Sequence, residues 1–420
     1  MDDTQRVSGA HRERPALARC IGVTPEEFGA WYWGRRPLLC RSGDLGRRAG
    51  KSYDDLITVA DVDDLVSRRG LRTPFLRMAN DGDVLPSPRY AGPGGAGAQI
   101  ADQALDERVL ACFAEGATLV LQGLHRLWPP LGDFARQLTD DLGHPTGVNA
   151  YLTPPASRAF APHYDTHDVF VLQIAGIKRW RVHAPVLTDP LAAQRWDART
   201  EEVSATADGP PELDLVLEPG DAMYLPRGWV HSAESLHELS MHLTVGVFPV
   251  TRYALLEAML GLAAEEPELR RSLPFGVDAS DPAQIAEELD ATTRLAARWL
   301  FEADPGRVAE RVRPQLWSQT RPAPIRPLAQ AAALRTVDSA TVIAVRTGLR
   351  WRLTSYQPER VILRTFDRTV EFPAECAEAI RTVLEGDPVR VADLPGLDPT
   401  DQVVLARRLL REAVVVPVDP

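Results

Sequence analysis

The stretch HYDTHDVFVLQIAGIKRWRVH, residues 163–183, decides the fold of this chain. Residues 168–182 are mostly apolar and rich in β-branched side chains, so we expect two strands that form a hairpin around Gly176. His163 and Asp165 open the stretch, and side chains two apart on a strand point to the same side of the sheet. The sequence therefore predicts a β-rich centre in which an imidazole and a carboxylate point at one place.

A second motif, PGDAMYLPRGWVH at 219–231, supplies a third polar group. It reads as a turn, a short strand at 222–225, another turn, and then His231 at the start of a new strand. Two histidines and one carboxylate on one face of an octahedron leave three positions open, as in non-haem Fe(II) oxygenases. We therefore predict that His163, Asp165 and His231 bind Fe(II) as the catalytic centre, and that 2-oxoglutarate and O2 take the open positions.

Lys178 is an exception in the composition of the chain. Of the 47 basic residues only Lys51 and Lys178 are lysines, and the other 45 are arginines. A compact ammonium on a flexible stem suits the distal carboxylate of 2-oxoglutarate. We predict that Lys178 binds this carboxylate; the alternative is an ordinary surface lysine.

Other histidines are weaker candidates for the metal. His167 is four residues from His163, so on a strand it would face the same side but lie further along. His242, within SMHLTVGVF, is expected to line the same interior. Contact with a metal-binding residue or with the substrate suits His242 better than binding the metal itself.

Several segments around these motifs resemble a known family. They are NAYLTP (149–154), LEPGDAMYLPRGWVH (217–231), SMHLTV (240–245), FGAWYWGRRPLL (28–39) and FLRMANDGDVLP (75–86). Over roughly residues 20–250 the chain resembles the JmjC-type ribosomal oxygenases, which are Fe(II)- and 2-oxoglutarate-dependent dioxygenases that hydroxylate side chains of ribosomal proteins. The resemblance implies an α+β chain with a double-stranded β-helix, a jelly-roll of the JmjC and cupin type. It also implies that Asn149 and Tyr151 line the cofactor or substrate side of the pocket.

Two departures from the family pattern bear on the target and the cofactor. Members from enteric bacteria that hydroxylate arginine carry arginine where this chain has Lys178, whereas eukaryotic histidine hydroxylases carry lysine, so arginine and histidine both stay open as targets. Gly246 stands where a small hydroxyl residue near the cofactor is expected. Thr244 is then the candidate to supply that hydrogen bond.

Length and charge limit the possible partners. No apolar run in the 420 residues is long enough for a membrane span, and the first twenty are too polar for a secretory signal, so we expect a cytoplasmic protein that does not bind a membrane. The four cysteines are scattered without a Cys-x-x-Cys pair, which argues against structural zinc. A net charge of −11 is compatible with a basic ribosomal protein as partner.

The chain is expected to divide into four parts: a polar tail at 1–18, a catalytic domain at 19–250, a helical region at 251–328 and a C-terminal domain at 329–420. Thr24-Pro25-Glu26-Glu27 predicts the start of the first helix. In the resembling family the helical region forms a homodimer and the C-terminal domain is a winged helix. Residues 331–420 hold 12 arginines and 13 acidic residues, so their net charge is 12 − 13 = −1. DNA binding needs a basic face, and we expect none here.

Competing functions remain open at this stage. The same Fe(II)- and 2-oxoglutarate-dependent reaction could act on a biosynthetic peptide or a tRNA base instead of a ribosomal protein. A non-redox metal-binding cupin would use the same ligands with His167 and would not need Lys178. A catalytically inactive scaffold is the third alternative, and the complete ligand set argues against it.

Overall fold

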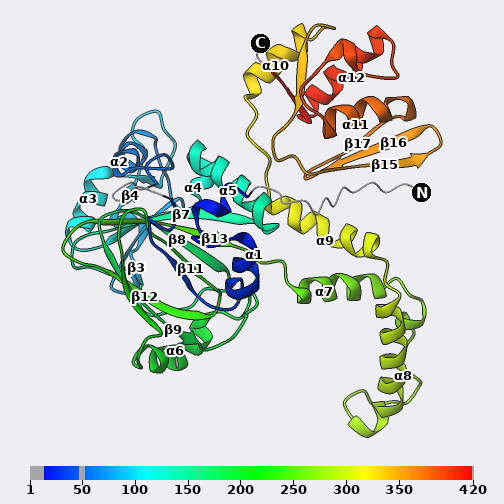
Figure 1. Ribbon diagram of the computed structural model, residues 1–420. Coiled ribbons are helices and arrows are strands. Elements are labelled where there is room, and N and C mark those ends of the chain that lie inside the picture. The colour runs from blue at the N-terminus through cyan, green and yellow to red at the C-terminus, as the bar shows by residue number, and fades with distance from the viewer. Residues whose placement is uncertain (1–13, 47–52, 159, 419–420) are drawn as a thin grey trace. The chain divides into compact units, whose positions relative to one another are not determined.

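The computed structural model describes residues 14–46, 53–158 and 160–418 and divides the chain into two compact units, Met1–Pro249 and Val250–Pro420 (Figure 1). The first is built around two antiparallel sheets and the second combines helices with two small sheets. Within the described residues, no helix combines the length and the apolar character needed to cross a membrane.

The first unit consists of a large and a small sheet that pack face to face. A single apolar cluster joins them, with Val171 from the large sheet and Trp180 and Val182 from the small one. In spatial order the large sheet holds β1 (Leu38–Cys40), β11 (Ala222–Leu225), β8 (Asp168–Ala175), β13 (Ser240–Val247), β7 (Thr146–Thr153), β6 (Thr118–Leu121), β2 (Leu76–Asn80) and β3 (Asp83–Val84). The small sheet holds β10 (Leu213–Leu217), β9 (Lys178–Pro185) and β12 (Trp229–Ser235).

Helices cover the other face of the large sheet. Phe170, Leu172 and Ile174 of β8 point into this second core, so β8 is buried on both faces, which explains its continuous apolar sequence. The remaining elements of the unit are η1 (Leu17–Arg19), α1 (Pro25–Glu27), η2 (Phe28–Tyr32), α2 (Val59–Arg68), η3 (Ser87–Arg89), β4 (Ala91–Gly92), β5 (Gln103–Ala104), α3 (Asp106–Ala114), α4 (Leu124–Leu127), α5 (Pro129–Leu142), η4 (Trp196–Arg199) and α6 (Thr200–Ala207).

The N-terminal segment begins the fold earlier than predicted. The helix start at Thr24 is as expected, because its hydroxyl accepts from the Glu27 N–H and the Glu27 carboxylate accepts from the Thr24 N–H. Of the predicted polar tail, residues 1–13 lie outside the described residues. Ala16 and Leu17, however, are completely buried, and both backbone N–H groups donate to Asp141 Oδ2 at 2.9 Å. The tail therefore ends before Ala16.

The predicted hairpin around Gly176 is wrong in its pairing. Both strands exist, as β8 and β9, but β8 pairs with β11 and β13 in the large sheet, whereas β9 pairs with β10 and β12 in the small sheet. The chain crosses from one sheet to the other at Gly176, which has φ +58°. Strand periodicity reports which side chains share a face and does not report the partner of a strand.

The second unit begins with helices and ends with an α+β core. Its helices are α7 (Arg252–Ala263), η5 (Glu268–Arg270), α8 (Pro282–Phe301), α9 (Pro305–Gln319), α10 (Pro327–Thr336), η6 (Ala374–Cys376), α11 (Ala377–Glu385), η7 (Val391–Asp393) and α12 (Pro399–Arg411). One sheet contains β18 (Val389–Arg390), β14 (Val342–Val345) and β19 (Val415–Pro417), and the other contains β15 (Trp351–Gln357), β16 (Arg360–Thr365) and β17 (Thr369–Pro373). Residues of α11, α12 and both sheets share one apolar core.

Gly176→Ala is expected to destabilise the protein strongly. A Cβ at this position would lie 1.9 Å from the Leu239 carbonyl oxygen, so the crossover itself would have to move. Gly70 is a matched control, since it has φ +59° and nothing within 4 Å of the corresponding Cβ. Thermal unfolding followed by circular dichroism should show a Tm lower by at least about 5 °C for Gly176→Ala than for Gly70→Ala. Equal Tm values would contradict this account of the crossover.

Candidate metal centre

Two segments far apart in the chain are joined by a backbone bridge at the centre. The His163 N–H donates to the His231 carbonyl at 3.1 Å, and the His231 N–H donates to the His163 carbonyl at 2.8 Å. His163 therefore lies in an isolated bridge ahead of β8 and not in a continuous strand as predicted. His231 lies near the start of β12, as predicted. A further bond from the Gly228 N–H to the Asp165 carbonyl, at 2.9 Å, holds the same two segments together.

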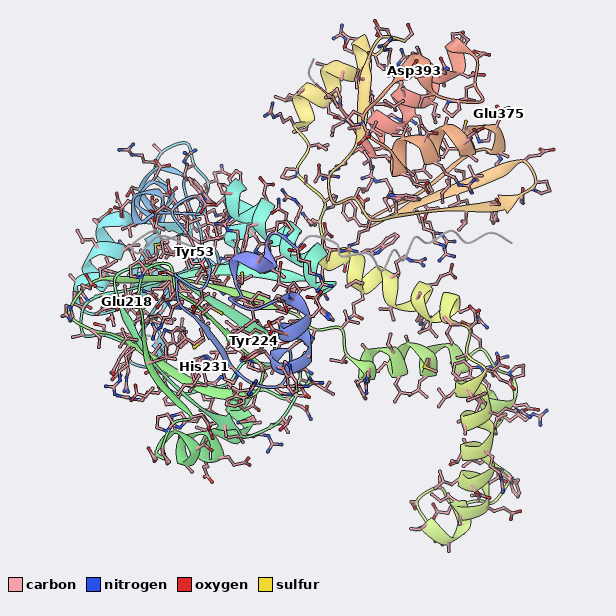
Figure 2. The ribbon with its side chains drawn as sticks, viewed as in Figure 1. Tyr53, Glu218, Tyr224, His231, Glu375 and Asp393 are labelled. Carbon is pink, nitrogen blue, oxygen red and sulfur yellow. The ribbon has the colours of Figure 1, made fainter. Side chains whose placement is uncertain are left out.

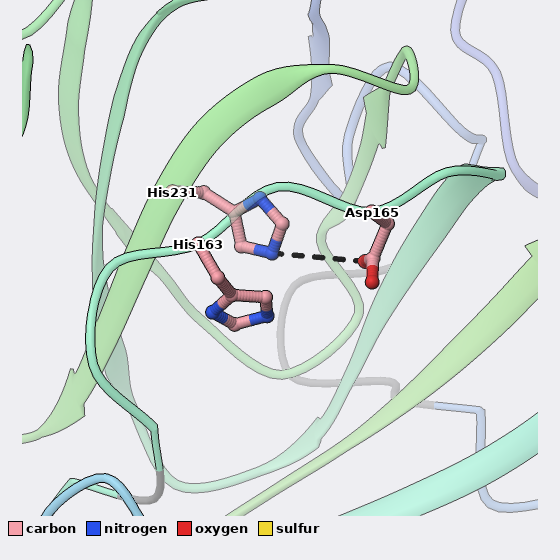
Figure 3. Close-up of side chains that lie close together, drawn as sticks. All are labelled: His163, Asp165 and His231. Carbon is pink, nitrogen blue, oxygen red and sulfur yellow. Dashed lines mark ion pairs between the residues drawn. The ribbon is translucent and has the colours of Figure 1, made fainter. Parts of the chain in front are cut away.

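The three predicted ligands converge. His163, Asp165 and His231 each offer a ligand atom within 4.8 Å of the others, and His231 Nε2 lies 3.8 Å from Asp165 Oδ2 (Figure 3). The two imidazole centroids are 4.6 Å apart. His231 is 8% exposed and lies between the strands of the first unit (Figure 2). This donor set fits a divalent transition metal such as Fe(II).

Hydrogen bonds orient both imidazoles for metal binding. His163 Nδ1 lies 2.8 Å from the Ala161 carbonyl, and His231 Nδ1 lies 3.0 Å from the Trp229 carbonyl. A carbonyl accepts only, so each Nδ1 carries the proton and each Nε2 keeps its lone pair for a metal. In both cases the acceptor is two residues earlier in the chain.

The protonation states also suit a metal centre. Burial, followed by the neighbouring His163, lowers the pKa of His231 to about 4, so this imidazole is neutral at pH 7. Burial by itself would raise the pKa of Asp165, but the imidazoles around it, His167 first, hold that pKa below its usual value. A neutral imidazole and an ionised carboxylate are the forms that bind metal.

A cavity of about 440 Å³ opens beside the three ligands. Asn149 and Tyr151 of β7 and Thr244 of β13 line it, as predicted from the resemblance. Asn149 is fixed in place, because its Oδ1 accepts from the Gly123 N–H at 2.9 Å. Their roles in cofactor binding stay predictions.

Lys178 is buried, and the structure shows a hydroxyl group as its hydrogen-bond partner. It is 2% exposed, its Nζ donates to Thr153 Oγ1 at 2.8 Å, and none of the ion pairs in the described part of the chain includes it. Lys178 is not among the residues that line the cavity, although its charge acts on His242, which does line it. Burial lowers the pKa of Lys178 to about 7. A surface lysine, the alternative considered above, is therefore excluded by its burial.

The unexpected Gly246 is explained by His167. The His167 ring stacks on Phe248, with centroids 5.1 Å apart and an interplanar angle of 12°. A Cβ at position 246 would lie 2.6 Å from His167 Cδ2, so no side chain fits there while the ring occupies this place. His167 lines the cavity but is not among the converging ligands.

Sequence reasoning did not single out several residues that line the cavity. Arg77, Phe160 and Trp196 all line it, and the Phe160 and Trp196 rings lie 6.0 and 6.2 Å from the His163 ring. The Arg77 guanidinium lies 5.3 Å from the Phe160 ring centroid. These residues come from segments without a recognisable spacing relative to the motif, so only the folded chain brings them together.

Comparison with known proteins agrees with this geometry. Residues 132–255 match the JmjC domain family. Ribosomal oxygenase 1 of Gallus gallus is 34% identical over 279 residues, which cover 64% of this chain and 44% of that protein. Ribosomal oxygenase 1 of Homo sapiens is 32% identical over 282 residues, which cover 65% of this chain and 41% of that protein. The resemblance of the chain to the JmjC ribosomal oxygenases is thereby confirmed. The chain spans less than half the length of these two relatives.

A solved structure supports the family fold. The ribosomal oxygenase YcfD of Escherichia coli superposes with a TM-score of 0.53 and 18% identity, over 94% of this chain and 98% of that one. The predicted JmjC and cupin-like fold, with mixed helices and strands, is thus confirmed.

Removal of one metal-binding side chain should weaken metal binding. Asp165→Ala eliminates the only carboxylate among the three ligands, so Co(II) affinity should fall at least about tenfold, the loss that even an outer-shell change produces. Isothermal titration calorimetry with Co(II) measures this directly. His237→Ala, at an exposed histidine, is the control and should bind like the parent. Undiminished Co(II) binding by Asp165→Ala would refute the assignment of the centre.

Proposed function

We propose that this chain is a 2-oxoglutarate-dependent dioxygenase that hydroxylates a side chain of a protein. The observation that carries the proposal is the convergence of His163, Asp165 and His231 at a cavity, together with the buried ammonium of Lys178, which forms no ion pair with the described residues. An unpaired buried cation is costly unless an anion joins it. The distal carboxylate of 2-oxoglutarate is an anion that suits this position. A YcfD structure has been solved with cobalt and 2-oxoglutarate.

Bound Fe(II), with O2 and 2-oxoglutarate, would supply an oxidant that places one oxygen atom in a C–H bond while 2-oxoglutarate becomes succinate and CO2. His163, Asp165 and His231 would hold the metal on one face and leave the other face open to the cavity. Val169, Val171 and Leu225, which line the cavity, would exclude water from the reacting groups.

The charges of the cavity favour a neutral target side chain over arginine. Among the described lining residues Asp165 is the only carboxylate, and it is a metal ligand, whereas Arg77 and Arg195 both line the cavity. A guanidinium entering here would meet like charges. Of the two targets left open by the sequence, we therefore propose histidine. The names of the relatives and the net charge of −11 support a basic ribosomal protein as its source.

Two other functions would use the same residues. A biosynthetic peptide or tRNA base would require the same chemistry, and only the product distinguishes these substrates. A non-redox metal-binding cupin would not need Lys178, because it binds no 2-oxoglutarate. The burial of this lysine without an ion pair in the described residues therefore favours the oxygenase.

We also propose that the second unit serves assembly and docking. Several large apolar side chains of α7 are exposed, which is the usual mark of an interface: Tyr253 (50%), Leu255 (43%), Leu256 (39%) and Leu260 (53%). A homodimer through this helical region would cover them, and sedimentation equilibrium of the intact chain measures it. The winged-helix character of residues 329–420, the lack of DNA binding, the four domain boundaries and the cytoplasmic location stay predictions.

Hydroxylation is expected in an assay with ribosomal proteins from a strain that lacks this gene. With Fe(II), 2-oxoglutarate and O2, the purified chain should add one oxygen atom to one protein, on histidine and not on arginine, as located by tandem mass spectrometry. Asp165→Ala should give no product. Absence of any product with the parent chain would remove support for a ribosomal target, and hydroxylated arginine would refute the charge argument.

The affinity for 2-oxoglutarate should depend on pH through Lys178. Below pH 7 the ammonium is charged and attracts the dicarboxylate; above pH 7 it is neutral in the free protein, and binding requires uptake of a proton. The apparent affinity should then fall by up to about tenfold per pH unit. Calorimetry of the Co(II)-loaded protein at pH 8, in buffers of different ionisation enthalpy, counts the protons taken up.

Lys178→Met is the matched variant for this experiment. It should bind 2-oxoglutarate at least about tenfold more weakly than the parent at pH 6.5 and should show no proton uptake at pH 8. Its ligand-free form should be more stable than the ligand-free parent below the ordinary lysine pKa, and the difference should grow as the pH falls to about 7 and stay constant below it, because within that interval the unfolded parent binds the Lys178 proton and the folded parent does not. Proton uptake that persists in Lys178→Met would assign the effect to another group.

A further inference from the structure

The second unit contains a groove between strand β17 and helix α12. The groove has a volume of about 520 Å³, and residues of both elements line it. β17 is the last strand in the order β15, β16, β17, so one of its edges has no neighbouring strand. The groove lies within the α+β core of this unit, because residues of β17 and α12 share one apolar cluster.

The groove runs along the free edge of β17. Glu371 is exposed and the adjacent Phe372 is 4% exposed, yet both line the groove. Successive side chains of a strand point to opposite faces of the sheet. A groove that meets both of these side chains therefore borders the edge of the sheet and not one of its faces.

Backbone groups of β17 are available on this edge. The Arg368 carbonyl and the Ala374 N–H, just before and just after the strand, form hydrogen bonds on the side of β16. Because backbone groups alternate between the two sides of a strand, Thr369 and Glu371 direct theirs to the free edge. No strand in the described part of the chain pairs with them there. Such a row of unpaired groups is a template for an added strand.

Apolar side chains are available to a strand bound in this groove. Phe372 and Leu405 are buried at its base, whereas Val404 of α12 is 54% exposed. Added strands bind through main-chain hydrogen bonds and place every second side chain in a neighbouring pocket. The exposed Val404 thus offers an apolar contact to alternate side chains of such a strand.

β17 and α12 run in opposite directions along the groove. The Arg368 guanidinium, just before β17, forms an ion pair of 3.4 Å with Glu412, just after α12. At the other end, a Cβ on Gly396, three residues before α12, would lie 3.9 Å from the carbonyl oxygen of Glu375, just after β17. Each end of the groove is therefore formed by the start of one element and the end of the other.

The two ends of the groove carry opposite charges. Glu375 and Asp401 line the end where β17 finishes and α12 begins. Three arginines of α12 line the opposite end: Arg407, Arg408 and Arg411. Glu412 pairs with the last two, and no ion pair in the described part of the chain includes Arg407. A ligand with a positive charge at one end and a negative charge at the other complements this arrangement.

We propose that the groove binds an extended segment of a partner protein as a fourth, antiparallel strand beside β17. In this direction the first residues of the segment lie near Glu375 and Asp401, and the last lie near Arg407 and Arg411. The segment then has a basic residue first, apolar residues at alternate positions and an acidic residue last. The inference gives the docking role proposed for the second unit a site and does not depend on the oxygenase reaction.

Two capped heptapeptides that differ only in the order of their charges test the inference. The first is Arg-Thr-Val-Thr-Val-Thr-Glu, and the second has the arginine and the glutamate exchanged. Fluorescence anisotropy of labelled peptides with the full-length chain should show the first peptide binding at least about tenfold more tightly. Equal affinities, a preference for the second peptide, or no binding of either would overturn the inference.

Substitutions locate the bound peptide. Val404→Lys, at an exposed position, should weaken binding of the first peptide at least about tenfold. Leu328→Lys is the matched control, because Leu328 is 87% exposed and does not line the groove. Glu371→Pro removes an N–H from the free edge and should weaken binding similarly, whereas Glu371→Gln keeps this N–H and should bind within about threefold of the parent. Unchanged binding by Val404→Lys would overturn the inference even if Glu371→Pro does not fold.

Hydrogen exchange of the full-length chain distinguishes strand addition from other surface binding. Saturation with the first peptide should slow amide exchange at Thr369 and Glu371, because both N–H groups would then be hydrogen-bonded. Unchanged exchange at these residues would overturn the strand addition. If the chain binds no peptide and Val404→Lys lowers its mass in sedimentation equilibrium, a second copy of the chain occupies the groove and the inference is wrong. None of these outcomes affects the oxygenase function, which the hydroxylation assay tests separately.

Discussion

The structure of the metal centre depends on the pair of backbone hydrogen bonds between His163 and His231. These residues are 68 positions apart in the chain, and one belongs to the segment before β8 while the other belongs to β12 of the small sheet. The bridge brings both imidazoles to one place, and the bond between Gly228 and Asp165 adds the carboxylate. Because these contacts are made by backbone groups, the site is held by the fold and not by the ligands themselves.

Sequence reasoning missed a second set of contacts that holds the metal centre in place. These contacts are made by Arg227, which lies in the turn before β12. The Arg227 N–H donates to Asp168 Oδ1 at 2.8 Å, and the Arg227 guanidinium lies 3.0 Å from Asp189 Oδ1. Asp168 is 1% exposed, and burial raises its pKa. The start of β8 is thereby tied to the turn that precedes β12. The metal centre is thus positioned by polar groups that touch neither a metal nor a substrate.

The interior between the two sheets combines apolar packing with unsatisfied polar groups. Val169, Val171 and Leu225 line the cavity, whereas buried Lys178 forms no ion pair and buried His242 Nδ1 has no hydrogen-bond partner among the described residues. Such groups lower stability in the ligand-free protein and are found where a ligand completes the interaction. The same buried groups, Lys178 and His242, therefore lower the stability of the ligand-free protein, and the Lys178 ammonium favours the proposed binding of a dicarboxylate.

The sequence by itself determined the local elements and the ligand set. The apolar run at 168–182 gave two strands, Thr24 gave a helix start, and the spacing of His163, Asp165 and His231 identified a metal site, since these properties depend on neighbours in the chain. Only the tertiary structure decided that β8 and β9 belong to opposite sheets and that Ala16 is part of the core. It also decided that His167 excludes a side chain at Gly246, and that His242 is fixed between two aromatic rings. The physical reason is that alternation along a strand specifies which face a side chain occupies, whereas the groups it meets across that face come from strands distant in sequence.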